Sequence, residues 1–326
     1  MKVKELVEKI FKNDKRFVSR AISIVESNNS NSAELLKELH KKTGKAYRIG
    51  ITGPPGSGKS TLTNQLAKYY RLQQKTVGII AVDPTSPFTG GALLGDRVRM
   101  NDIGNDPGIF IRSMATRGSL GGLSKKTIDA ADVLDAAGYD FIIFETVGVG
   151  QSELDIAKAA DTTVVMLVPE SGDSIQAMKA GLMEIADFFV LNKSDRPGSD
   201  TAQTSLKTIL MLKDHTEKDW LPGIIKCIAS ENIGTKEIAD EIQRHRDFMI
   251  INNLLKEKRE ENYKIRIKEI AETLLKNELW MQERESFLNE SLQKVADGTT
   301  SPYQVAETLF NDFKQKAILR EQDGRK

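Results

Sequence analysis

The spacing of hydrophobic residues changes twice along this chain of 326 residues. From residue 3 to about residue 42, apolar side chains recur at helical spacing, and a polar break at 27–30 separates two predicted helices. Asn31 and Glu34 have the spacing of a capping box at the start of the second helix. Short apolar runs follow from about 46 to 230. Beyond about 233 the chain is helical and highly charged, with a predicted break at 297–302.

The central region predicts an α/β fold, with a mostly parallel sheet covered by helices on both faces. Apolar runs of strand length alternate there with helical segments. The predicted strands span residues 47–52, 76–82, 108–111, 140–144, 162–168, 187–191 and 224–228. Ligands bind such sheets at the carboxyl ends of the strands, so we expect functional residues directly after them.

The changes of pattern suggest three regions: an N-terminal helical extension at 1–45, a central domain at 46–247 and a C-terminal helical region at 248–326. The last region carries long apolar stripes on charged helices. They comprise Ile250, Ile251, Leu254, Leu255, Ile265, Ile267, Ile270, Leu274 and Leu275. Such stripes pack back on the domain or against a second copy of the chain, and we favour a homodimer.

Composition argues against several classes of protein. The net charge of +1 gives no basic field for nucleic acid. The longest apolar stretches are far shorter than the ~20 residues that cross a bilayer, and no signal core opens the chain, so we expect a cytoplasmic protein without a membrane partner. Cys227, the only cysteine, reads as a strand residue rather than a nucleophile, and the three histidines are scattered, so no transition-metal site is visible.

A glycine-rich loop between a predicted strand and a predicted helix indicates nucleoside triphosphate binding. The loop comprises Gly53, Pro54, Pro55, Gly56, Ser57, Gly58, Lys59 and Ser60. Its glycines let backbone N–H groups approach phosphate oxygens, Lys59 reaches the β- and γ-phosphates, and the Ser60 hydroxyl ligates Mg²⁺. The helix that follows presents its positive N-terminus to the anion.

A second motif indicates which base the nucleotide carries. It consists of Asn192, Lys193, Ser194 and Asp195, which directly follow an apolar strand. A carboxylate at Asp195 accepts hydrogen bonds from guanine N1–H and the 2-amino group. Adenine lacks both donors and would leave the carboxylate unpaired, so the pattern specifies guanine.

Three carboxylates occupy positions suited to Mg²⁺ and the attacking water: Asp83 after the second strand, Asp96 in the next loop and Glu145 after the fourth strand. Asp83 also suits a turn or cap, and Asp96 also suits an ion pair with Arg97 or Arg99. Two glycine-containing loops beside this position read as switches that respond to the γ-phosphate: residues 84–95, and residues 146–151 with Gly148 and Gly150.

Together these stretches resemble the MeaB, or methylmalonic aciduria type A, family of P-loop GTPases, long also labelled ArgK, which accompany adenosylcobalamin-dependent mutases. The resemblance covers nearly the whole chain. It is carried by residues 53–61, 82–87, 90–100, 145–153 and 192–195, and Thr61 completes the first of these.

The resemblance implies roles for individual residues. Lys59 and Ser60 would hold phosphate and Mg²⁺, Asp83, Asp96 and Glu145 would serve Mg²⁺ and hydrolysis, and Asp195 would read guanine. Gln151 or one of the acidic residues would orient water. Residues 176–187 look like the family's additional switch toward the mutase, with Lys179 as its candidate, although Lys179 also suits a solvated helix. The last base-binding loop departs from the family's Ser-Ala and carries Ile228, Ala229 and Ser230, whose backbone would still contact guanine O6.

The resemblance implies a homodimeric GTPase that binds Mg²⁺ with GTP or GDP and turns over slowly alone. It would gate adenosylcobalamin loading into a partner acyl-CoA mutase, of which methylmalonyl-CoA mutase is the first expectation, and protect that mutase; cobalamin need not touch this chain. Three alternatives remain open: a metal-delivery GTPase, a kinase associated with basic amino-acid transport, and a GTP-dependent scaffold with negligible hydrolysis.

Overall fold

The computed structural model describes residues 2–27, 30–83, 101–115, 122–146, 152–171, 181–211 and 219–323. Contacts within the chain divide it into two compact units, Met1–Arg259 and Glu260–Lys326. The boundaries drawn from the sequence at 45/46 and 247/248 remain a prediction. None of the helices in the described residues is long and apolar enough to cross a membrane.

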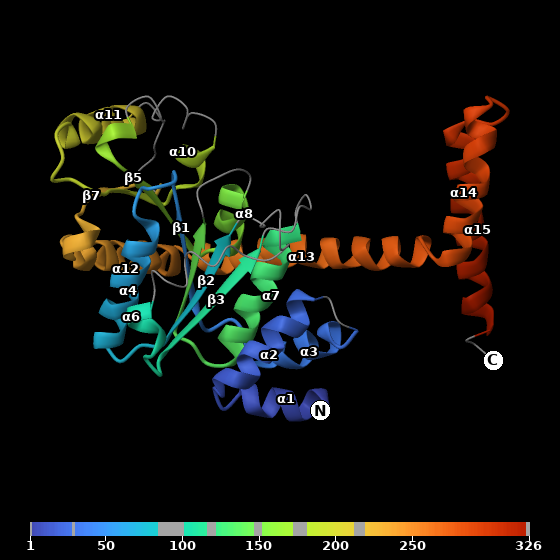
Figure 1. Cartoon of the computed structure of the whole chain (residues 1–326), viewed down its shortest axis with the longest axis horizontal. Helices are drawn as coiled ribbons and strands as arrows, with labels where there is room; N and C mark the ends of the chain where they lie inside the picture. Colours follow the sequence, from blue (N-terminus) through green and yellow to red (C-terminus); the bar gives the residue numbers. More distant parts are fainter. Residues whose placement is uncertain are drawn as a thin grey trace. The chain divides into compact units, whose positions relative to one another are not determined.

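The first unit is built on a seven-stranded sheet in the order β3-β2-β4-β1-β5-β6-β7, in which every neighbouring pair runs parallel (Figure 1). The strands are β1 (Tyr47–Thr52), β2 (Val77–Asp83), β3 (Ile109–Ala115), β4 (Phe141–Thr146), β5 (Thr162–Leu167), β6 (Phe188–Leu191) and β7 (Ile224–Lys226). The predicted α/β fold is therefore confirmed.

Helices cover both faces of this sheet. They are α1 (Val3–Ile10), α2 (Lys15–Glu26), α3 (Ser32–Leu39), α4 (Lys59–Leu72), α6 (Asn101–Gly104), α7 (Gly122–Ala136), α8 (Ser152–Ala159), α10 (Leu182–Ile185), α11 (Ser199–Met211) and α12 (Thr235–Ile251). Short 3₁₀ turns lie at η1 (His40–Lys42), η2 (Pro169–Ser171) and η4 (Ala229–Glu231).

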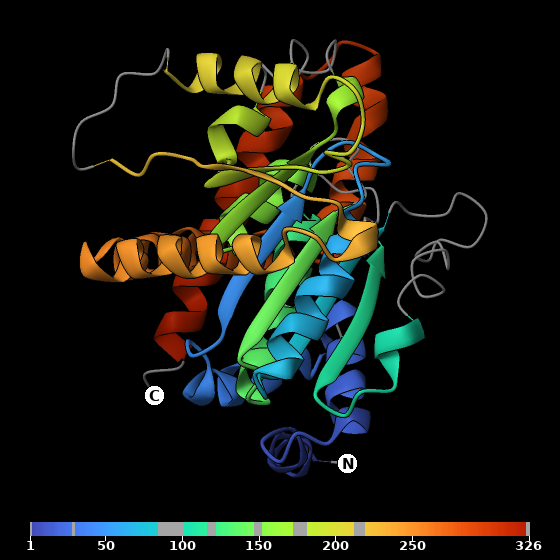
Figure 2. The ribbon, with the colours of Figure 1, turned by 90° about the vertical axis from the view of Figure 1, so that its left-hand side faces the viewer.

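Alternate residues of the central strands enter different cores, because successive side chains of a strand point to opposite faces. Ile142 and Phe144 pack in one core with α1, α2, α3, α7 and α8, whereas Ile143 packs in the other with α4 and α12. In Figure 2 the light-blue helix α4 lies across the near face of the sheet. A third core lies between β5, β6 and α11.

The N-terminal extension is helical as predicted, but the first of its two predicted helices is divided at residues 11–14 into α1 and α2. The predicted capping box is also wrong. Helix α3 begins after Asn31, whose side chain makes no capping hydrogen bond. Asn31 has φ −84° and ψ −6°, so its backbone is already near-helical rather than extended. A capping side chain reaches the following N–H groups from an extended backbone, which explains the difference.

Two buried carboxylates hold the amino end of β1. Asp135 at the end of α7 accepts the backbone N–H groups of Gly44, Lys45 and Ala46 at 2.7, 3.1 and 3.0 Å. Asp161 accepts the N–H of Arg48 at 2.8 Å and pairs with the Arg259 guanidinium at 2.7 Å. The Arg48 guanidinium pairs with Asp132 at 2.6 Å. The strand that leads into the glycine-rich loop is thus anchored where it starts.

Replacing Asp135 by alanine should destabilise the protein by roughly 3 kcal/mol, because three backbone N–H groups, of which that of Ala46 is fully buried, lose their acceptor. Asp200→Ala is the matched control, since the side chain of Asp200 is 96% exposed and its ion pair with Lys226 is worth little. Urea unfolding of both variants measures the difference, and equal stability of the two would contradict the anchoring role.

A buried polar chain links β1, β5 and α12. The Tyr47 hydroxyl lies 2.6 Å from Thr162 Oγ1, which in turn lies 2.8 Å from His245 Nδ1. The other ring nitrogen of His245 lies 3.4 Å from the Asp187 carboxylate, and the Trp220 ring packs edge-on against the imidazole. Burial lowers the pKa of His245, and the nearby Asp187 opposes this only in part.

His245 should therefore make stability fall with acid. Its pKa in the folded protein lies below the ordinary value near 6.5, so the unfolded chain takes up the proton first as the pH falls. The stabilisation is complete above about pH 6.5 and declines below it, by up to about 1.4 kcal/mol per pH unit. Unfolding of wild type and His245→Gln between about pH 7.5 and 5.5 tests this; parallel pH curves would contradict it.

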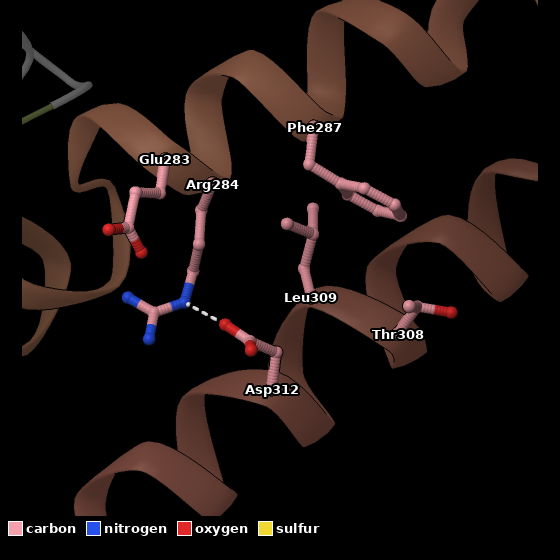
Figure 3. A pocket seen from close by; sticks show the side chains of 6 residues that line it. All are labelled: Glu283, Arg284, Phe287, Thr308, Leu309 and Asp312. Carbon is pink, nitrogen blue, oxygen red and sulfur yellow. Dashed lines mark hydrogen bonds and ion pairs between the residues drawn. The ribbon is translucent and has the colours of Figure 1, made fainter.

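The second unit contains most of α13 (Leu254–Leu279), together with α14 (Gln282–Ala296) and α15 (Pro302–Asp323). Helices α14 and α15 form a hairpin across the predicted break. The Arg284 guanidinium donates to the Asp312 carboxylate at 2.9 Å, and Phe287 and Leu309 face one another across a shallow pocket (Figure 3). The predicted apolar stripe on α13 is solvent-exposed in the single chain, at Ile265, Ile267, Ile270, Leu274 and Leu275.

Candidate nucleotide-binding site

The parallel sheet brings the predicted functional segments to one edge. Gly53 follows β1, Asp83 ends β2, Glu145 lies near the end of β4 and Asn192 follows β6. Glu145 is in register with Ile51 of β1 and with Ala81 of β2. Because all these strands point the same way, their following loops meet at the carboxyl edge, where parallel sheets bind ligands.

The glycine-rich loop has a backbone that glycine alone adopts without strain. Gly53, Gly56 and Gly58 have φ of 137°, 75° and 97°. A Cβ on Gly53 would lie 2.2 Å from the Met166 carbonyl oxygen, and one on Gly58 would lie 2.2 Å from Asn192 Nδ2, whereas a Cβ on Gly56 would meet nothing within 4 Å. The loop therefore packs closely against β5 and the segment after β6 and leaves the Gly56 side open.

Lys59 begins α4 and closes the loop on itself. Its ammonium group donates to the carbonyl oxygens of Gly53 and Pro54 at 2.8 and 2.9 Å, and the side chain is buried. The N-terminus of a fourteen-residue helix and a cation thus converge inside one loop. That combination attracts phosphate oxygens, since the helix end supplies N–H donors and a positive dipole end.

Hard oxygen atoms of the type that Mg²⁺ prefers lie beside Lys59. The Ser60 hydroxyl donates a short hydrogen bond to the Glu145 carboxylate, which is buried. The Thr146 hydroxyl, next in sequence, lies 2.9 Å from the Thr52 hydroxyl and ties β4 to β1 at this edge. A hydroxyl and a carboxylate in contact at the mouth of a phosphate loop fit Mg²⁺, which takes few protein oxygens and keeps several waters.

Asn192 joins this loop to the segment after β7. Its Nδ2 donates to the Ser57 carbonyl oxygen at 2.7 Å, and its Oδ1 accepts the Ala229 N–H at 3.0 Å. Lys193, next along, has φ 56°, an uncommon value for a residue with a side chain. Asp195 is exposed, so its carboxylate is open to a base.

Cys227 braces the same segment from beneath. Its N–H donates to the Leu191 carbonyl at 3.0 Å, its carbonyl accepts the Ser194 N–H at 3.1 Å, and its thiol contacts Asn192 Oδ1 at 3.3 Å. Burial raises the pKa of the Cys227 thiol to about 12. A thiol that stays protonated is a poor nucleophile, which agrees with its prediction as a structural residue. It lies one residue beyond β7.

Several predicted residues fall outside the described part of the chain. These are Asp96, Gly148, Gly150, Gln151 and Lys179, while Asp83 is described by its backbone alone. Their roles remain predictions. The predicted residues that the structure does bring together are Lys59, Ser60 and Glu145 on one side, and Ser57, Asn192 and Ala229 on the other.

The sequence did not reveal the contact between Thr52 and Thr146 or the contribution of Gln65 at this edge, although Thr146 opens a predicted switch loop. The first two are hydroxyl residues at the ends of two strands that become neighbours only when β4 pairs with β1. The Gln65 side chain on α4 reaches the Ala229 carbonyl at 3.2 Å. The only sequence feature that marked Gln65 was its polar side chain between the buried Leu62 and Leu66, and many helices with an exposed face show that pattern.

Comparison with known proteins agrees with this geometry. A family model described as "Methylmalonyl Co-A mutase-associated GTPase MeaB" matches residues 18–284. A Pyrococcus abyssi protein provisionally designated a GTPase is 46% identical, over 95% of this chain and 97% of its own. The mitochondrial methylmalonic aciduria type A homolog of Mus musculus is 31% identical, over 96% of this chain and 80% of its own.

A solved structure shares the fold over nearly the whole chain. The crystal structure of a protein described as an LAO/AO transport system kinase superposes with a TM-score of 0.71 at 26% identity, covering 96% of this chain and 97% of that one.

Alanine at Gly58 should weaken Mg²⁺–GDP binding by about 100-fold or more. Its Cβ would push Asn192 off both the Ser57 carbonyl and the Ala229 N–H. Gly56→Ala is the matched control. Its positive φ gives a similar backbone strain of about 1–2 kcal/mol, but its Cβ would have no atom within 4 Å. Calorimetric titration of both variants measures the difference, and equal losses would show that φ strain rather than the Asn192 contact governs the loop.

Proposed function

Because this chain belongs to the MeaB family of methylmalonyl-CoA mutase-associated GTPases, we propose that it hydrolyses GTP to control cofactor loading into an adenosylcobalamin-dependent acyl-CoA mutase. Family membership makes the chain a GTPase. The partner, the gating and the residue roles are our proposal. The structural observation that carries the nucleotide part of this proposal is the Asn192 bridge, which joins the phosphate loop to the proposed base loop.

In this proposal the chain's residues position charge rather than form covalent bonds. Phosphoryl transfer to water needs an aligned nucleophile and stabilisation of charge on the phosphate oxygens. Lys59 would exchange its two carbonyl contacts for phosphate oxygens. Ser60 and Glu145, already in contact, would hold Mg²⁺ directly or through its waters, with Asp83 and Asp96 as further acidic groups. The bound ion would neutralise negative charge on the phosphates.

We assign water orientation in this proposal to Gln151 or one of these acidic residues. The segments around Gly148, Gly150 and Lys179 would change conformation when the γ-phosphate leaves, and would report the nucleotide state to the mutase. If these segments adopt the arrangement needed for hydrolysis only when the mutase is bound, the chain alone should hydrolyse GTP slowly.

Guanine is the proposed base because Asp195 offers an exposed carboxylate directly after the Asn192 bridge. Ser230 lies on the facing loop, where its backbone N–H group can approach guanine O6, whereas the Ala229 N–H is already donated to Asn192 Oδ1.

Asp195→Asn should therefore lower GTP affinity by about 100-fold or more and create affinity for XTP. Xanthine carries an oxygen where guanine carries its 2-amino group, so an amide donor would replace the carboxylate acceptor. Competition binding with GTP, XTP and ATP measures the change. Asp200→Asn, an exposed carboxylate on α11, is the control and should leave all three affinities unchanged. A loss of GTP binding without any gain for XTP would contradict the assigned contact.

A mutase partner is supported by the family description and by the name of the mouse relative. Homodimerisation is supported by the exposed apolar stripe on α13, which a second copy would cover. Residence in the cytoplasm belongs to the same proposal.

Purified methylmalonyl-CoA mutase should accelerate GTP hydrolysis by this chain about tenfold or more, if the partner completes the hydrolytic arrangement. Steady-state phosphate release with and without the mutase, and with ATP as substrate control, is the test. Hydrolysis that stays specific for GTP but indifferent to every acyl-CoA mutase would remove the partner and leave the GTPase.

The rival functions are separated by simple assays. The structural relative is described as a transport-system kinase, so radiolabelled γ-phosphate should be followed to see whether it reaches an acceptor or is released free. A metal-delivery role would require a tight Ni²⁺ or Zn²⁺ site in a metal titration. A scaffold would bind GTP and show negligible single-turnover hydrolysis.

A further inference from the structure

We propose that Gln65 is a positioning residue that couples the phosphate-binding helix to the base-recognition loop, and thereby raises the affinity for guanine nucleotides. The inference rests on the proposed guanine site and extends it to a residue outside the nucleotide-binding motifs. Gln65 lies on α4, the helix that begins at Lys59, and its side chain is half-buried. Its amide donates to the Ala229 carbonyl oxygen at 3.2 Å.

This bond closes a ring that joins the phosphate loop to the base loop. Asn192 Nδ2 donates to the Ser57 carbonyl at 2.7 Å, and Asn192 Oδ1 accepts the Ala229 N–H at 3.0 Å. The Ala229 carbonyl then accepts from Gln65, and the chain from Ser57 through the start of α4 closes the ring. Ala229 is therefore hydrogen-bonded through its N–H to Asn192, after β6, and through its carbonyl to Gln65 on α4.

The contacts within the loop that carries Ala229 fix its shape but not its position relative to the phosphate loop. The loop folds back on itself through a bridge between Ile228 and Ile233, and the Asn232 N–H reaches the same Ala229 carbonyl at 3.3 Å. A Cβ on Gly234 would lie 2.7 Å from the Lys226 carbonyl, so the loop closes tightly at its base. These contacts set the loop's shape, whereas Asn192 and Gln65 set its position against the phosphate site.

Glutamine is suited to this task by its length and chemistry. The buried Leu62 and Leu66 fix the face of α4 on which Gln65 stands, and α4 packs beside η4. Lys68, one turn further along the helix, is directed elsewhere and lies 3.9 Å from Asp102 with its side chain 46% exposed. Lys68 is thus a matched position on the same helix without a link to the base loop.

This ring of contacts predicts which ligands should bind more weakly when Gln65 is replaced. A nucleotide that contacts both loops benefits from their fixed spacing, because less ordering entropy is lost on binding. A ligand without a base contacts the phosphate loop alone. Inorganic tripolyphosphate is such a ligand, and its affinity should not depend on the position of Ala229.

The test is calorimetric titration of GDP and of tripolyphosphate, each with Mg²⁺, into wild type, Gln65→Met and Lys68→Met. Methionine keeps the length and helix propensity of glutamine but removes the donor. Loss of one neutral hydrogen bond should raise the Kd of Gln65→Met for GDP about 3- to 10-fold, with the Kd for tripolyphosphate within about twofold of wild type. Lys68→Met should change neither.

An unchanged GDP affinity in Gln65→Met would overturn the inference, and so would equal weakening of both ligands, which would mean that Gln65 only supports the helix. Thermal unfolding of each variant verifies that it is folded. If Gln65→Met does not fold, Gln65→Glu replaces it in the titrations. The glutamate carboxylate would lie against the Ala229 carbonyl oxygen and should weaken GDP binding further. Titration of ADP into wild type separates the two claims. Equal affinity for GDP and ADP would overturn the guanine site together with this inference, whereas strong preference for GDP with an indifferent Gln65 would overturn this inference alone.

Discussion

The side-chain amide of Asn192 holds together two loops that lie far apart in the chain. Its partner Ser57 precedes it by 135 residues, and its partner Ala229 follows it by 37. One end of the amide donates to the phosphate loop, and the other accepts from Ala229 in the segment after β7. A buried amide with both ends bonded is costly to disturb, because any movement leaves a polar group unpaired. The proposed distance between the phosphate and base positions therefore depends first on this amide, and the Gln65 contact to Ala229 supplements it.

The opposite edge of the sheet makes that arrangement rigid. Asp135 and Asp161 fix the chain just before and at the start of β1, and Arg259 ties Asp161 to the first turns of α13. At its other end β1 runs into a loop whose closest approaches are to Met166 and Asn192. A strand held at both ends presents the glycine-rich loop on a fixed platform, and fixed donors lose little free energy to reorganisation when charge develops on a bound phosphate.

Local patterns predicted the strands, the glycine-rich loop and the segment from Asn192 to Asp195, because each is written in consecutive residues. The contact between Ser60 and Glu145 was implied once both were placed at the carboxyl edge. Contacts that depend on packing were beyond the sequence. The link between Gln65 and Ala229 requires α4 to lie beside η4, and the anchoring of β1 by Asp135 requires the end of α7 to meet residues 44–46. The capping prediction at Asn31 failed because the spacing of side chains does not fix the backbone angle on which capping depends.

The central claim is that this carboxyl edge is a guanine-specific site for triphosphate hydrolysis. Single-turnover hydrolysis by the purified wild-type chain, with GTP and ATP in parallel reactions containing Mg²⁺, tests it most directly. Our account predicts that GTP is converted to GDP and free phosphate, and that ATP at the same concentration is left intact. Equal hydrolysis of the two nucleotides, or binding of GTP without any release of phosphate, would contradict it.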